Sequence, residues 1–115
     1  MKFKSKQIIY NLYFTKSEFE DVLYGLKDRR EFFVSLKDET LDLTILSVDA
    51  LIEKIEKIIS SFVDEDEILV SLERSELVTV SYGLFNLSES YEELKDWENL
   101  NRVWDFYKEI EDVLR

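Results

Sequence analysis

The side chains that could support catalysis in this chain are carboxylates, lysines, tyrosines and hydroxyls, because its 115 residues include neither histidine nor cysteine. Without imidazole or thiol groups, the chain cannot build a Ser-His-Asp triad, a Cys-His pair or a zinc site with His or Cys ligands. Its two glycines, Gly25 and Gly83, are isolated, so no glycine-rich loop can hold a phosphate. A carboxylate pair could hydrolyse a glycoside, but that reaction usually needs a long cleft that a small chain rarely provides. We therefore expect no catalytic residue, no cofactor and no metal site.

The densest group of charges is an acidic run of four residues, Asp64, Glu65, Asp66 and Glu67. It does not fit a calcium loop of the EF-hand type, because apolar residues follow it and no glycine supplies the turn. Such a run either stays solvated or binds Lys and Arg side chains of a partner through charge-assisted hydrogen bonds. If two similar loops lie side by side, Asp38, Glu39 and Asp42 extend the same partner-binding patch.

The net charge of −11 is unevenly distributed along the chain. Residues 1–30 carry seven Lys/Arg and four Asp/Glu, a net +3, whereas residues 31–115 carry eight and twenty-two, a net −14. A surface of this sign repels phosphate backbones and attracts basic proteins. The alternative is that the charge only keeps the protein soluble. We expect a basic protein partner and no direct binding of nucleic acid.

The absence of cysteine favours a reducing compartment. No apolar run approaches the roughly 18 residues that a membrane span needs. The basic N-terminus leads into an apolar stretch that Asn11 interrupts, without the small-residue cleavage site of a signal peptide. We therefore expect a cytoplasmic protein without membrane contact. Its length, and the lack of any linker-like segment, predict one domain over residues 1–115.

Three segments have helical spacing of apolar residues. The first begins at Thr15, where Glu18 stands at the spacing of a capping box. The second covers residues 48–62 after a possible cap at Ser47. The third begins near residue 86 or 88 and runs to the end, a length of about 40 Å at ~1.5 Å per residue. A helix of that length must overhang, bend around residues 99–101, or pack against another molecule, so a homodimer through residues 88–115 is one alternative.

Between these helices the sequence alternates as strands do. Residues 32–37 and 41–46 flank one turn, and residues 68–73 and 77–82 flank another. Residues 6–14 fit either a strand or a helix. The prediction is an α+β fold in the order β-α-β-β-α-β-β-α, with an antiparallel sheet of four or five strands and three helices. A weak similarity between residues 33–36 and 69–72, 36 residues apart, suggests a duplicated helix–hairpin unit.

In such a sheet, alternate residues face away from the core. Phe33 and Leu69 fall in this outward set, among hydroxyl-bearing neighbours. Solvent, a helix or a docked partner could cover that face. With the acidic residues of the two loops, Phe33 and Leu69 complete the predicted partner-binding set.

The leading hypothesis is a non-catalytic protein-binding inhibitor, most simply an immunity protein that neutralises a basic toxin such as a nuclease. Catalytic residue types are missing, the chain is small, and its acidic surface would speed the capture of a basic target. Two alternatives remain open. One is a nucleic-acid mimic, such as a phage inhibitor of a defence nuclease, and the other is a dimeric structural or assembly module.

Overall fold

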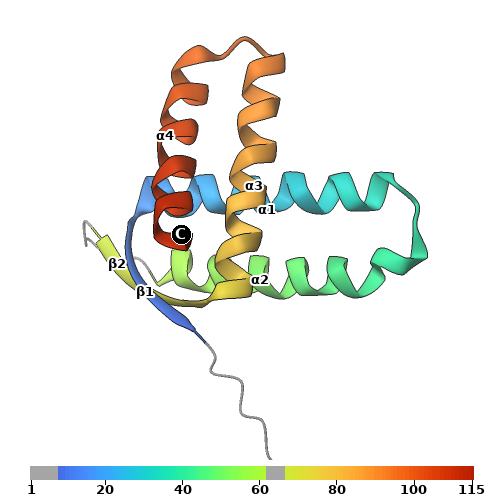
Figure 1. Ribbon diagram of the computed structural model, residues 1–115, viewed down its shortest axis with the longest axis horizontal. Coiled ribbons are helices and arrows are strands. Elements are labelled where there is room, and N and C mark those ends of the chain that lie inside the picture. Colours follow the sequence, from blue (N-terminus) through green and yellow to red (C-terminus); the bar gives the residue numbers. More distant parts are fainter. Residues whose placement is uncertain (1–7, 62–66) are drawn as a thin grey trace, which may run out of the picture.

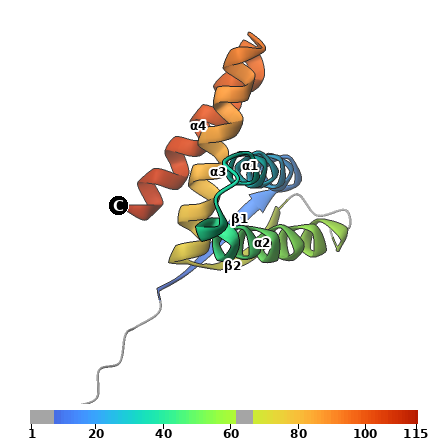
Figure 2. The same ribbon diagram turned by 90° about the vertical axis from the view of Figure 1, so that its right-hand side faces the viewer.

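The computed structural model describes residues 8–61 and 67–115, which form a two-stranded antiparallel sheet and four α-helices. In chain order the elements are β1 (Ile9–Thr15), α1 (Lys16–Ser35), the 3-10 turn η1 (Glu39–Leu41), α2 (Asp42–Ser60), β2 (Glu67–Glu73), α3 (Arg74–Glu93) and α4 (Trp97–Leu114). Figure 1 shows α1 and α2 as one antiparallel pair of helices, which α3 and α4 cross as a second pair. Figure 2 looks along the first pair and shows the second pair rising away from it.

The predicted sheet of four or five strands with three helices is wrong, because both predicted hairpins are largely helical. Residues 32–35 end α1, residues 42–46 begin α2, and residues 77–82 lie inside α3. Only residues 68–73 form the predicted strand. Alternation over six residues also fits a helix, and no glycine or proline lies between Leu26 and Ser35 to interrupt it. The helix therefore continues through the supposed strand.

The repeat predicted at 36 residues is also wrong, since it compares a helix with a strand. The order strand–helix–helix instead occurs twice at an offset of 58 residues, from Ile9 to Glu67 and from Lys16 to Arg74. Short sequences recur at the same offset: residues 24–26 and 82–84 both read Tyr-Gly-Leu, and residues 36–38 and 94–96 both read Leu-Lys-Asp. Each half of the chain thus supplies one strand and one pair of helices.

The strands relate the two halves by an approximate two-fold rotation. In the antiparallel register Leu12 pairs with Val70, and these two residues are equivalent in the repeat. Residues 9–14 are therefore a strand and not a helix, the two structures that the sequence allows for this part of the chain. Phe14, Val70 and Leu72 on the inner face are buried. This face of the β1–β2 pair, which we call the ribbon, packs against the helices and contributes to the hydrophobic core.

The helices α1 and α3 cross at their glycines. A Cβ atom added to Gly25 would lie 2.7 Å from the carbonyl carbon of Gly83, and one added to Gly83 would lie 2.8 Å from that of Gly25. Such contacts are far inside van der Waals separation, so only glycine permits this approach. Phe19, Leu26, Leu77 and others around the crossing are fully buried and fill the core.

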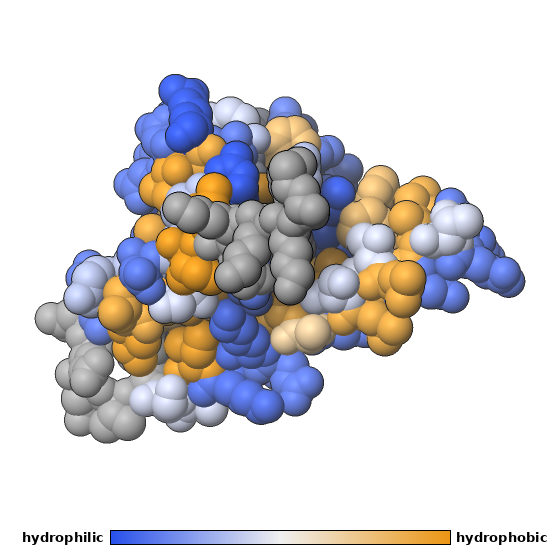
Figure 3. All heavy atoms as spheres, turned by 60° about the horizontal axis from the view of Figure 1, so that its bottom comes forward, coloured by the Kyte–Doolittle hydropathy of each residue, from blue (hydrophilic) through white to orange (hydrophobic). Residues whose placement is uncertain are grey.

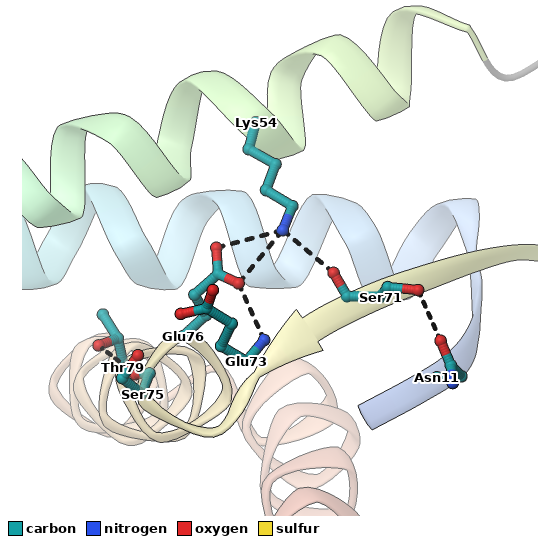
Figure 4. A network of polar contacts seen from close by, with 7 residues as sticks. All are labelled: Asn11, Lys54, Ser71, Glu73, Ser75, Glu76 and Thr79. Carbon is teal, nitrogen blue, oxygen red and sulfur yellow. Dashed lines mark hydrogen bonds and ion pairs between the residues drawn. The ribbon is translucent and has the colours of Figure 1, made fainter. Parts of the chain in front are cut away.

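Local hydrogen bonds fix where the helices begin. The capping box predicted at Thr15 is confirmed: its hydroxyl accepts from the Glu18 N–H at 3.1 Å, and the Glu18 carboxylate accepts from the Thr15 N–H at 2.9 Å. At the equivalent point of α3, Glu76 accepts from the Glu73 N–H. Figure 4 shows Lys54 of α2 reaching both the Glu76 carboxylate and the Ser71 carbonyl. This lysine connects the first pair of helices to the start of the second.

The long C-terminal helix is interrupted earlier than predicted. The second helix pair turns at residues 94–96, where Lys95 adopts a positive φ of 56° and Asp96 caps α4 by accepting from the Asn99 N–H. A left-handed residue followed by a side-chain cap ends one helix and begins the next. Similarly, α2 begins at Asp42 and not after Ser47. The apolar face of α4 is buried against its own chain through Val103, Phe106 and Ile110.

Candidate partner-binding cleft at the α1–α2 turn

The turn between α1 and α2 forms an open cleft of about 350 Å³, which we call the tip cleft. It is lined by Phe33, Val34, Lys37, Asp38, Glu39, Asp42 and Ile45. Four of these residues belong to the predicted partner-binding set, namely Phe33, Asp38, Glu39 and Asp42. The turn therefore brings together residues that the sequence places in two predicted strands and a loop.

The backbone of the turn brings the carboxylates to one rim. Lys37, two residues after the end of α1, adopts the left-handed region with a φ of 50°. The Asp38 carboxylate then accepts hydrogen bonds from the Thr40 N–H at 3.0 Å and from its hydroxyl at 2.7 Å. Because this local bonding caps the 3-10 turn, Glu39 follows at once and Asp42 opens α2. The acidic rim is thus a consequence of the cap.

The floor of the tip cleft is apolar and fixed. Phe33 is partly buried and packs against the core, while Val34 keeps 47% of its surface exposed. The Arg29 guanidinium lies 4.4 Å from the centre of the Phe33 ring and also donates to the Asn86 side chain of α3. A cation over an aromatic face holds the ring in place. The floor is therefore a preformed apolar surface.

The rim carries an excess of negative charge. The segment of residues 31–46 contains four acidic side chains and one basic side chain, Lys37, a net charge of −3. Hydrogen bonds from the Thr40 hydroxyl and N–H lower the pKa of the Asp38 carboxyl, so it is ionised at neutral pH. Among the described residues, no ion pair within 4 Å engages Asp38, Glu39 or Asp42.

An apolar floor beside carboxylates that form no ion pair within the described residues would suit a long basic side chain. The aliphatic stem of a lysine or arginine would pack on Val34 and Ile45, and its charged end would reach the rim. Figure 3 shows hydrophobic and strongly hydrophilic side chains adjoining at the right-hand end of the molecule, which carries the α1–α2 turn. The tip cleft therefore combines an apolar floor with carboxylates on its rim.

The remaining predicted partner-binding residues lie elsewhere. Leu69 is half-exposed on the outer face of the ribbon, where it pairs with Tyr13, and Glu67 begins β2. The ribbon and the α1–α2 turn lie at opposite sides of Figure 1. Phe33 and Leu69 do not share a sheet face, because Phe33 lies in α1. Asp64, Glu65 and Asp66 fall outside the described residues.

Sequence reasoning missed Val34, Lys37 and Ile45, which complete the tip cleft. All three lie in residues 32–37 and 41–46, which the sequence predicts to be strands. One signal was available in the spacing of Asp38 and Thr40, since an Asp two residues before a Thr often forms a local cap. That spacing favours a helix start over the middle of a hairpin.

No protein-family model, curated protein or solved structure matches this chain. Within residues 8–61 and 67–115, no three acidic side chains are grouped so that they could hold a metal ion. None of the described helices has the length and apolar character needed to span a bilayer.

Proposed function

We propose that this chain is a non-catalytic inhibitor that binds a basic protein, with the tip cleft receiving a lysine or arginine of that partner. The most specific form of the proposal is a cytoplasmic immunity protein that neutralises a basic toxin such as a nuclease. The observation that carries it is the acidic rim of the tip cleft, which lies beside an apolar floor and has no ion-paired cation of its own among the described residues.

The energetics of recognition suit this arrangement. Interface residues that dominate binding often sit in pockets from which water is excluded, and arginine is prominent among them. The apolar floor would bury the stem of such a residue, and the rim would pair with its charge. The net charge of the whole chain would also steer a basic partner and raise its association rate at low salt.

The direct test is titration of the purified chain with any basic protein that an adjacent gene encodes, at low and at physiological ionic strength. We expect a 1:1 complex whose association slows as salt is added, because steering depends on unscreened charge. Absence of a complex at low salt would contradict the proposal. Release of the partner's DNA, together with loss of the complex when duplex DNA is added, would instead identify a nucleic-acid mimic.

Paired variants separate the rim from the general charge. Asp38→Asn with Asp42→Asn removes two rim charges, and we expect association to slow by about tenfold at low salt. Asp105→Asn with Asp112→Asn removes the same charge from the exposed face of α4 and should slow association by less than about twofold. Val34→Ser should mainly speed dissociation, because it removes apolar contact and no charge. Equal effects of both charge pairs would mean that the tip cleft is not the contact site.

A further inference from the structure

A second cleft lies between α3 and α4 and has a volume of about 330 Å³. It is lined by Phe85, Ser88, Glu89, Glu92, Leu100, Asn101 and Trp104, and we call it the aromatic cleft. Phe85 and Trp104 remain 41% and 39% exposed although both belong to an aromatic group. Trp104 stacks on Tyr107 with ring centres 5.1 Å apart, and Tyr107 also contacts Phe85. The indole is therefore held in place with part of its surface open.

Two carboxylates border these rings. Glu89 and Glu92 stand three residues apart on α3, so they lie on the same side of the helix. In the part of the chain that the structure describes, neither forms an ion pair within 4 Å. Aromatic faces and carboxylates both attract cations, whereas either group alone is common on protein surfaces. Their combination in one cleft therefore favours a ligand that carries a positive charge.

The first pair of helices shows what occupies the corresponding position there. At the offset of 58 residues, Arg30 is the counterpart of Ser88, and its guanidinium binds Asp49 of α2. The first half thus places a cation of its own between its two helices. The second half has a small serine at that position, with Glu92 and Trp104 where the first half has Val34 and Leu46. The chain therefore supplies no arginine at this point in its second half, while the surrounding groups favour a cation.

We propose that the aromatic cleft binds an organic cation with a short apolar stem, such as an alkylguanidinium or alkylammonium group. The cation lies over the exposed part of the Trp104 indole and pairs with Glu89 and Glu92, and its stem packs on Phe85 and Leu100. The cleft volume lies at the lower end of the range for small-molecule sites, which fits a ligand of this size. The site is distinct from the tip cleft and does not depend on the function proposed for it.

The test uses the full chain carrying Trp97→Phe, so that Trp104 is the single tryptophan. Trp97 is 56% exposed and does not line the cleft, so this change leaves the site intact. The probes are n-butylguanidinium, n-butylammonium and the neutral isostere n-butylurea, and the readout is the NMR signal of the Trp104 indole N–H. We expect a saturable shift with both cations and no saturable shift with butylurea, because cation–π and ion-pair attraction need the charge.

Matched variants locate the binding. Glu89→Gln with Glu92→Gln should weaken the affinity for butylguanidinium at least about tenfold, since both paired carboxylates are lost. Glu93→Gln with Glu98→Gln makes the same charge change outside the cleft and should leave the affinity within about twofold. A tighter response to an arginine-containing tripeptide than to butylguanidinium would identify a protein side chain as the natural ligand, and the reverse order would identify a free amine. A linear response, an equal response to butylurea, or an equal loss in both variants would overturn the proposal.

Discussion

Asp21 shows how a single side chain joins the two halves. Its side chain is 6% exposed, and its two oxygens accept from Nε and from a terminal nitrogen of Arg102 on α4 at 3.1 and 2.9 Å. This hydrogen bonding raises the pKa of the Arg102 guanidinium. A buried carboxylate needs such a partner, because desolvation of the unpaired charge is costly. In the repeat, Asp21 is equivalent to Thr79 and Arg102 is equivalent to Thr44, so the ion pair has no symmetric counterpart between the two halves.

Replacing Arg102 by methionine would leave the Asp21 charge buried without its partner. We expect the free energy of unfolding to fall by about 3 kcal/mol, the lower end of the range for broken buried pairs, because Arg102 itself is 45% exposed. Chemical denaturation measures this loss. The control is Lys57→Met, which removes an exposed pair with Glu53 and should cost less than about 0.5 kcal/mol. Similar losses in both variants would mean that Asp21 finds another partner.

The hydrogen bonds of Asp38 can be measured by its titration. Because the hydroxyl and N–H of Thr40 stabilise the carboxylate, the pKa of Asp38 in the folded protein lies below its ordinary value. Their contribution to stability is therefore present above that ordinary value and is lost as the pH falls through the folded pKa. In Thr40→Val only the N–H remains, and the pKa should rise toward the ordinary value. NMR titration of the Asp38 carboxyl carbon tests this, and an unchanged midpoint would contradict the assigned role of the hydroxyl.

At the level of elements, the crossing of α1 and α3 makes glycine indispensable at two places. Alanine normally favours a helix over glycine by about 1 kcal/mol. Here Gly25→Ala or Gly83→Ala would force a Cβ against the backbone of the other helix, so each should destabilise the protein by at least about 2 kcal/mol. Thermal unfolding provides the measurement. Ala50→Gly on the exposed side of α2 measures the effect of helix propensity alone. If Gly25→Ala or Gly83→Ala stabilised the protein, α1 and α3 would have to be able to move apart.

The elements differ in how far the sequence predicts them. Thr15 and Glu18 locate the start of α1, and alternation from Ile9 to Phe14 fits β1, because both signals depend only on neighbouring residues. The strand prediction for residues 32–46 is wrong, because short alternating runs without glycine or proline fit a strand as well as a helix. Of the residues that line the tip cleft, the sequence predicted only the acidic residues and Phe33 as part of a binding surface. Its apolar floor depends on a helical turn that the strand assignment removed.

At the level of the whole molecule, the chain is held together by contacts between its halves. The ribbon pairs one strand from each half, the glycines pack α1 on α3, and Arg102 of α4 binds Asp21 of α1. The Phe14 ring packs edge-to-face on Phe19 and on Phe106, which belong to different helix pairs. Neither half retains these contacts alone, so partial unfolding would expose apolar surface on both.

We therefore expect both halves to unfold together. In native-state hydrogen exchange, the slowest amides of α1 and α3 should open with the same free energy, because each helix buries the other. The same denaturant midpoint should be seen by tyrosine and by tryptophan emission, since both tryptophans lie in the second half. A separate, earlier transition reported by tryptophan would show that the second half unfolds independently.

The paired strands have one more consequence for how the chain is assembled. Leu12 and Val70, which pair at the centre of the ribbon, are 58 positions apart, yet they meet as two identical subunits would meet across a symmetry axis. The molecule thus resembles a dimer whose subunits share a covalent tether, and the tether keeps the effective concentration of each half high. Cleavage of the peptide chain between α2 and β2 would make its stability depend on protein concentration, whereas the intact chain folds equally well at any dilution.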